Sequence, residues 1–110
     1  MTEANQVNLA IRTNLGPLGL FLRCEHAHDV GWADWWYALR GVSGWIEAKL
    51  IPASGRRPDH FTREQLMWGE QLALHNVPWF LLGLREAPGR RLRSWLLYDA
   101  PAARSWFEDR

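Results

Sequence analysis

Hydrophobic and polar residues alternate along several short stretches of the chain, which is the pattern of half-buried β-strands. The clearest case is residues 45–50, where Ile46, Ala48 and Leu50 point to one face and Glu47 and Lys49 point to the other. The first face is predicted to be core, and the second to carry chemistry. Five strands are predicted from such patterns, over residues 18–28, 33–39, 44–51, 79–84 and 93–98.

A different periodicity predicts helices before, between and after these strands. Thr62 and Gln65 have the spacing of a capping box at the start of an amphipathic run. The sequence Asn76-Val77-Pro78 ends that run, because proline does not continue a helix. Helices are therefore predicted over residues 3–14, 62–75 and 101–109.

The order of these elements is helix, three strands, helix, two strands, helix. This order predicts an α/β fold in which helices flank a central mixed sheet of about five strands. The 110 residues are sufficient for one domain, predicted to span residues 1–110. With 47% hydrophobic residues and eight tryptophans, the chain can form a core without disulfides or a structural metal.

The charged residues single out one position. The formal net charge is only +1, so the chain lacks the overall positive charge typical of nucleic-acid-binding domains. Its 13 basic residues comprise twelve arginines and one lysine, Lys49. Lysine and arginine are not interchangeable where a compact ammonium is required, so the single lysine marks its surroundings as a candidate site. The single cysteine, Cys24, and the lack of a long apolar run predict a cytoplasmic protein without membrane contact.

The segment before Lys49 predicts a β-hairpin that brings two carboxylates together. If the chain turns tightly at Arg40-Gly41, the register places Asp34 opposite Glu47. Their Cβ atoms would then lie about 5 Å apart, and like charges in that position destabilise a sheet unless something compensates. A four-residue loop would instead offset the two carboxylates by about 13 Å, and they could not share a metal.

A divalent cation held by oxygen ligands is the natural compensator. A site with two carboxylates, Mg²⁺ or Mn²⁺, and the ammonium of Lys49 could promote the attack of water on a phosphodiester. The metal would polarise a phosphoryl oxygen and lower the pKa of a bound water. Lys49 could orient that water or stabilise the charge developing on the phosphate. The alternative is an exposed hairpin whose charged side chains are simply solvated.

One polar residue of the middle predicted helix lies on the side that should face the sheet. This is Gln65, and Gly69 one turn later would allow the helix to approach the sheet closely. Gln65 is therefore predicted either to support the site or only to complete the cap with Thr62.

The candidate site residues, taken in their order along the chain, resemble the motif of the PD-(D/E)XK nuclease superfamily. The resemblance is carried by Ala33-Asp34, by Glu47-Ala48-Lys49 thirteen residues later, and by Phe61-Thr62 leading into a helix with Gln65. The further match of Gly31, Trp45, Trp68 and Asn76-Val77-Pro78-Trp79 makes residues 30–84 similar to small VRR-NUC-type and phage Holliday-junction-resolvase-like nucleases.

The resemblance implies a restriction-endonuclease-like core and a set of roles. Asp34, Glu47 and the backbone carbonyl of Ala48 would bind Mg²⁺, Lys49 would assist the attacking water, and Gln65 would support the site. The family often adds a glutamate from the first helix, a place that only Glu3 can fill here. Where the motif has a proline, this chain has Ala33. In the family that proline shapes the strand and does not bind the metal, so the difference leaves the metal ligands unchanged.

Other residues near this motif are predicted to contact DNA. Arg56, Arg57 and Arg63 flank the loop after the Glu47-Ala48-Lys49 strand and are candidate phosphate contacts. Trp36 is a candidate for stacking on unpaired bases, with core burial as the alternative.

These observations predict a metal-dependent DNA endonuclease, with branched DNA such as a Holliday junction as the expected substrate and a homodimer as the expected assembly. The alternative is a nuclease-like module that binds DNA or a protein without cutting. A third interpretation is a zinc site built on residues that alternate along one strand, namely Cys24, His26 and His28 with the adjacent Asp29.

Overall fold

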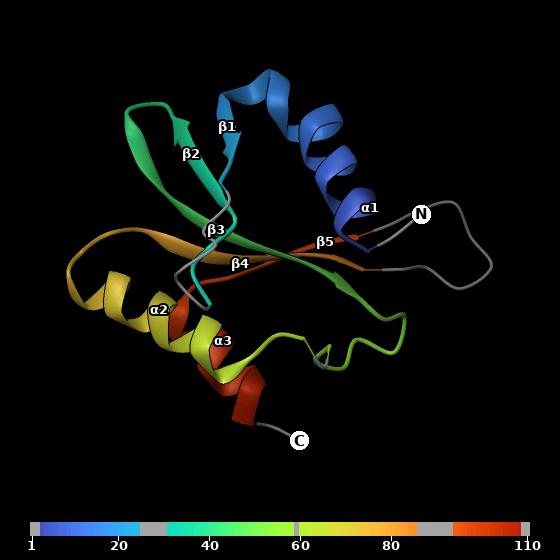
Figure 1. Cartoon of the computed structure of the whole chain (residues 1–110), viewed down its shortest axis with the longest axis vertical. Helices are drawn as coiled ribbons and strands as arrows, with labels where there is room; N and C mark the ends of the chain where they lie inside the picture. The colour runs from blue at the N-terminus through green and yellow to red at the C-terminus, as the bar shows by residue number, and fades with distance from the viewer. Residues whose placement is uncertain (1–2, 25–30, 59, 86–93, 109–110) are drawn as a thin grey trace.

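The computed structural model describes residues 3–24, 31–58, 60–85 and 94–108, with the side chains of residues 3–5 excepted. One sheet runs through the middle of the molecule, and helices cover both of its faces (Figure 1). Its strands lie in chain order: β1 (Leu20–Arg23), β2 (Trp35–Leu39), β3 (Val42–Ile51), β4 (Trp79–Arg85) and β5 (Ser94–Tyr98).

Only the β3–β4 pair is parallel among the strand pairs of the described residues, and the other three are antiparallel. The helix α2 (Arg63–Leu74) makes the crossover that a parallel pair requires. The predicted α/β class and the mixed five-stranded sheet are therefore confirmed, and they are consistent with a restriction-endonuclease-like core.

The predicted first helix is shorter than expected. The α-helix α1 (Glu3–Ala10) passes into a π-helical turn, Ile11–Leu15, and a 3₁₀ turn, Gly16–Leu18. Pro17 has no backbone N–H to donate, so regular helical hydrogen bonding does not continue beyond these two turns. Because the two turns were not predicted, the predicted order of elements matches the structure only loosely. The last helix, α3 (Ala100–Glu108), begins one residue before its predicted start.

Several strand boundaries also differ from the prediction. Residue 18 belongs to the 3₁₀ turn, the described β1 ends at Arg23, and the predicted residues 25–28 lie outside the described part of the chain. The strand β2 begins at Trp35, two residues later than predicted, and β3 begins at Val42, two residues earlier. The early start of β3 follows from the turn before it, which uses only two residues.

The β2–β3 hairpin has the predicted tight turn. Arg40 and Gly41 both have positive φ, 51° and 81°, as a two-residue turn of type I′ requires. The pairs Trp35↔Ile46, Tyr37↔Gly44 and Leu39↔Val42 follow, so the predicted register is confirmed. The four-residue loop is excluded.

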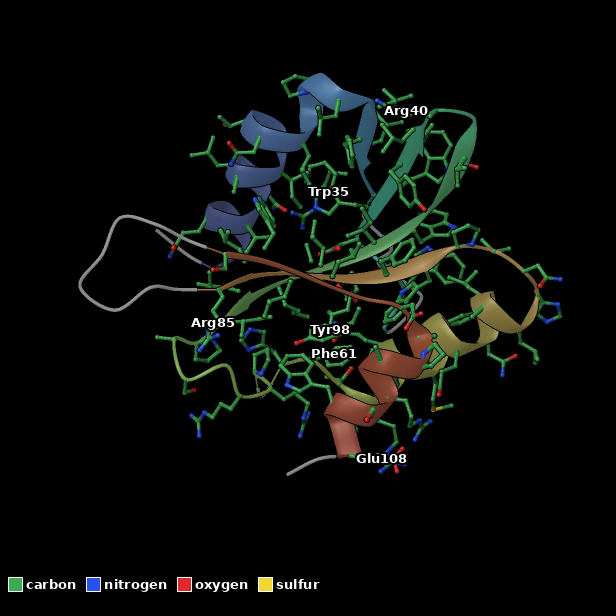
Figure 2. The ribbon with its side chains drawn as sticks, turned by 180° about the vertical axis from the view of Figure 1, so that it is seen from behind. Trp35, Arg40, Phe61, Arg85, Tyr98 and Glu108 are labelled. Carbon is green, nitrogen blue, oxygen red and sulfur yellow. The ribbon has the colours of Figure 1, made fainter. Side chains whose placement is uncertain are left out.

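One core lies between the sheet and α1. It contains Val7, Ile11, Trp35, Tyr37, Ile46, Ala48, Leu82 and Leu84. The indole Nε1 of Trp35 donates a 3.0 Å hydrogen bond to Oδ1 of Asn8, which joins this helix to β2. Figure 2 shows Trp35 on this side of the sheet, with Phe61 and Tyr98 on the other.

A second core lies between the sheet and the pair α2 and α3. Its buried members are Ala33, Phe61, Leu66, Trp79, Leu81, Ala100 and Ala103. The sequence predicted a core on the opposite face of β3, and the structure adds a second apolar core on the face that Glu47 and Lys49 share. Gly69 permits close approach of α2, as predicted, since a Cβ there would lie 2.5 Å from the ring of Trp79.

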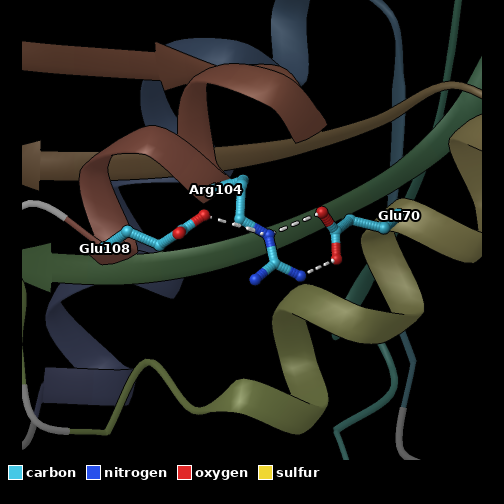
Figure 3. Close-up of polar contacts among 3 residues, drawn as sticks. All are labelled: Glu70, Arg104 and Glu108. Carbon is cyan, nitrogen blue, oxygen red and sulfur yellow. Dashed lines mark hydrogen bonds and ion pairs between the residues drawn. The ribbon is translucent and has the colours of Figure 1, made fainter.

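An ion pair joins α2 to α3 at the surface. The guanidinium of Arg104 donates to both carboxylate oxygens of Glu70, and Glu108 lies 3.6 Å away on the same helix as Arg104 (Figure 3). The hydrogen bonds from Arg104 lower the pKa of Glu70. Because both side chains are partly exposed, solvent screens this pair and its contribution to stability is small.

Candidate active site

Asp34 and Glu47 lie together, as the hairpin register requires. Asp34 immediately precedes β2, and Glu47 follows the last paired residue of that hairpin on β3. Burial raises the pKa of Glu47 well above its ordinary value, and the neighbouring Asp34 raises it further by its charge and by hydrogen bonding. Glu47 is only 2% exposed and Asp34 is half-buried, so the pair is partly withdrawn from water.

The carboxyl group of Glu47 is not fully satisfied. Its Oε1 atom is buried and has no hydrogen-bond partner among the residues that the structure describes. A buried carboxylate without partners is costly, and proteins compensate it with a proton, a cation or a hydrogen-bond donor. Burial and the charge of Asp34 raise the pKa of Glu47 and so favour a proton here, and a divalent cation would fit the same need.

Asp34 is held by the backbone of the neighbouring strand. The N–H of Ala48 donates a 3.0 Å hydrogen bond to Oδ1 of Asp34, at the point where β2 has ended and offers no ladder partner. Burial raises the pKa of Asp34, whereas this hydrogen bond and the charge of Lys49 lower it. The side chain of Asp34 thus completes the edge of β3 while remaining beside Glu47.

The direction of the Ala48 carbonyl follows from the same hydrogen bond. In a strand, the N–H and C=O of one residue point to the same side. Trp45 donates to Pro78 on the β4 side, and Ala48 donates to Asp34 on the opposite side. The carbonyl of Ala48 therefore points past the end of β2, towards the side of Asp34. This direction suits the predicted role as a metal ligand, which stays a prediction.

Lys49 lies on the same face of β3 as Glu47, two residues further along. It is only 7% exposed, which is unusual for lysine. Its positive charge lowers the pKa of both Asp34 and Glu47. The structure therefore brings together the three residues on which the sequence prediction depended most.

The sequence reasoning missed Arg23. This residue ends β1 opposite Trp35, and the next residue, Cys24, donates a 2.8 Å hydrogen bond to the carbonyl oxygen of Asp34. The charge of Arg23 reaches both carboxyl groups and lowers the pKa of each. The only sequence signal was the predicted strand at 18–28, whose pairing with β2 would have placed an arginine beside Asp34.

Gln65 has the capping role that the sequence left open. Its Oε1 accepts a 2.9 Å hydrogen bond from the backbone of Thr62, and its own N–H donates to Oγ1 of Thr62 at 3.3 Å. Gly31, with φ of 84°, packs against this first turn of α2, since a Cβ there would meet the backbone of Glu64 and Gln65. A contribution of Gln65 to the site stays a prediction.

The predicted DNA contacts differ in their surroundings. Arg57 Nη1 donates a 2.8 Å hydrogen bond to the carbonyl of Phe61, and its guanidinium lies 4.1 Å from the ring centre of Phe107, so it fastens the loop before α2 to α3. Arg56 and Arg63 are exposed. Trp36 is partly buried opposite Trp45, on the face of Glu47.

The remaining candidate ligands lie at the limits of the described residues. Glu3 is the first residue of α1, and its side chain is outside the described part, as are His26, His28 and Asp29. Cys24 Sγ donates weakly to the carbonyl of Leu22 at 3.7 Å. Within the ranges described, no group of three or more His, Cys, Asp and Glu side chains surrounds a possible metal position.

A search with protein-family models found no match to the chain, and a search of curated proteins found no significantly similar sequence. Over the described residues, none of the helices has the length and apolar character needed to cross a membrane.

Proposed function

We propose that this protein is a Mg²⁺-dependent deoxyribonuclease that hydrolyses phosphodiester bonds in DNA as an endonuclease. The observation that carries the proposal is the carboxyl pair of the half-buried Asp34 and the buried Glu47, in which Glu47 Oε1 has no hydrogen-bond partner among the described groups and Lys49 lies alongside. Two carboxylates and a backbone carbonyl are a suitable donor set for Mg²⁺, which retains several waters. Mn²⁺ has the same preference for oxygen ligands.

Each residue has a role that follows from its position. Asp34 and Glu47 would hold the cation, which polarises a phosphoryl oxygen and makes a bound water more acidic. Lys49 would hydrogen-bond the attacking water and stabilise negative charge on the phosphate. The burial of this group strengthens each of these electrostatic interactions.

A specific observation favours the rival function, a nuclease-like module that binds DNA or a protein without cutting. Oδ1 of Asp34 is already engaged by Ala48, and the described part of the chain supplies no third carboxylate to the pair. A site with two carboxylates can bind a cation weakly and turn over slowly or not at all.

Cleavage assays separate the two functions. The full chain is incubated with four-way, flap, single-stranded and duplex DNA in Mg²⁺ or Mn²⁺, next to Glu47→Gln and Lys49→Ala. The nuclease function requires cleavage by the wild type that each variant lowers at least 100-fold, about 2.7 kcal/mol of transition-state stabilisation. Glu108→Gln, an exposed carboxylate on α3, is the matched control and should cleave normally. Absence of cleavage, or equal cleavage by all variants, would favour the binding module.

We also propose that the protein acts as a homodimer in the cytoplasm, with branched DNA as substrate. An apolar groove of about 430 Å³ on the α1 side of the sheet supports the dimer, because Leu97 and Val42 beside it are 61% and 51% exposed. Sedimentation of the wild type and of Leu97→Asp tests this. A monomeric wild type would contradict it.

A further inference from the structure

A layer of indole rings connects the candidate active site to the outer surface of α2. Trp45 lies on β3 two residues before Glu47 and on the same face, so the two side chains start about 7 Å apart. Trp32 packs edge-on against Trp45, with ring centres 5.2 Å apart, and in the same manner against Trp68, at 4.7 Å. Trp68 therefore lies within a few nucleotide lengths of the carboxyl pair.

Beside Trp68, the surface of α2 is hollowed. The hollow has a volume of about 300 Å³ and is lined by Glu64, Met67, Trp68 and Gln71, which lie on one side of the helix. Trp68 and Met67 are 36% and 53% exposed, although most large apolar side chains of such a domain are buried. The helix thus presents an aromatic ring and a flexible thioether to the outside, next to the candidate site.

The side chains around the hollow match the chemistry of a nucleobase. An indole ring offers a flat surface on which any base can stack. The amide of Gln71 can donate and accept hydrogen bonds, and the carboxylate of Glu64 can accept from the exocyclic amino group of a base. Arg63, one residue before Glu64 and one turn before Met67, places an exposed positive charge where a backbone phosphate would follow.

We propose that this hollow binds an unpaired nucleobase of the substrate, stacked on Trp68. Bases within a duplex are already stacked on their neighbours, so only a base that is single-stranded or extruded can reach the ring. The inference rests on the proposed nuclease function and narrows its substrate class to DNA with an unpaired segment next to the scissile phosphate.

Binding is measured in the Glu47→Gln background, so that cleavage does not interfere. The probes are a fluorescein-labelled single-stranded oligonucleotide and its blunt duplex, followed by anisotropy. Adding Trp68→Ala should weaken binding of the single strand about tenfold and change duplex binding less than twofold, given the usual contribution of base stacking. Trp68→Phe should restore most of the affinity. Leu74→Ala, which removes a 72% exposed side chain from the same helix, is the control and should have no effect.

The outcomes for the base site and for the nuclease are distinguishable. The base site is overturned if the Glu47→Gln protein binds the single strand equally well with and without Trp68→Ala. It is also overturned if the Glu47→Gln protein does not bind the single strand at all, whatever the cleavage assays show. Loss of single-strand binding with Trp68→Ala, in a chain that cleaves no DNA, supports the base site and overturns only the nuclease. Equal cleavage of blunt duplex and of DNA with an unpaired segment by the wild type also overturns the inference. Circular dichroism verifies that each variant is folded.

Discussion

The backbone N–H of Ala48 donates a 3.0 Å hydrogen bond to Oδ1 of Asp34, a residue fourteen positions earlier in the chain. The bond takes the place of a ladder interaction that β2 is too short to make. One side chain thus completes the sheet and contributes a carboxylate to the candidate site.

Two substitutions of Asp34 should separate these contributions. Asp34→Ala leaves the Ala48 N–H without its acceptor and should lower the free energy of unfolding by about 1–3 kcal/mol. Asp34→Asn keeps an oxygen in the same place and should cost less than about 1 kcal/mol, while nuclease activity is lost in both. Urea denaturation measures the difference, and equal destabilisation by the two substitutions would contradict this role of the hydrogen bond.

Glu47 should reduce stability at neutral pH in the absence of metal. Its pKa is higher in the folded protein than in the unfolded chain, so the folded state binds the proton more tightly. Stability is therefore greatest below the ordinary pKa and falls as the pH rises through the raised pKa. Glu47→Gln should flatten this dependence and raise stability at neutral pH by about 1–2 kcal/mol. Thermal unfolding across pH 4–8 tests this range, and Glu108→Gln should follow the wild type.

Mg²⁺ should stabilise the wild type by replacing the proton on the carboxyl pair. At a concentration 100 times the Kd, a ligand that binds only the folded state adds about 2.7 kcal/mol. The melting temperature should rise with Mg²⁺, more steeply at pH 8 than at pH 5, because cation and proton compete for the same oxygens. Glu47→Gln should show little of this rise. A shift of equal size in that variant would place the cation elsewhere.

Arg23 should influence the pH at which the cation binds. Its charge lowers the pKa of both Asp34 and Glu47, so Arg23→Ala should move the midpoint of Mg²⁺-dependent activity to higher pH. Arg40→Asn removes a charge at the far end of the hairpin while tolerating positive φ there, and it should leave the midpoint unchanged. An unchanged midpoint in Arg23→Ala would show that its charge is screened by solvent.

The close contact between α2 and the sheet requires glycine at position 69, because there is no room for a side chain. A Cβ at position 69 would lie 2.5 Å from the ring of Trp79, and both residues are buried. Gly69→Ala should therefore lower the free energy of unfolding by about 1–3 kcal/mol, although alanine favours helix. Ala73→Gly, at an exposed position of the same helix, is the comparison and should cost about 1 kcal/mol from propensity alone.

The carboxyl pair could be predicted from sequence because its geometry is local. A two-residue turn and the alternation of side chains are sufficient to place Asp34 beside Glu47, and the structure has this register. The capping box of Thr62 and Gln65 was predictable for the same reason, since all its atoms lie within one helical turn.

The features that were missed depend on contacts between distant segments. Arg23 reaches the carboxyl pair only through the pairing of β1 with β2, and the intervening connection gives no turn signal that sets this register. The second apolar core, on the face of β3 that carries Glu47, could not be predicted from β3 alone. Most of its members come from other segments, among them α2 and α3. The exposure of Trp68 likewise depends on where α2 lies on the sheet.

The turn at Arg40-Gly41 lies six residues from Asp34, a distance of about 20 Å along the strand. This two-residue turn sets the pairing register, and because side chains alternate with a period of two, a register shift of one residue would move Asp34 to the opposite face and separate it from Glu47. The length of a remote surface turn is therefore a condition for assembling the carboxyl pair. Changes at the hairpin tip that shift this register are expected to abolish metal binding without replacing any ligand.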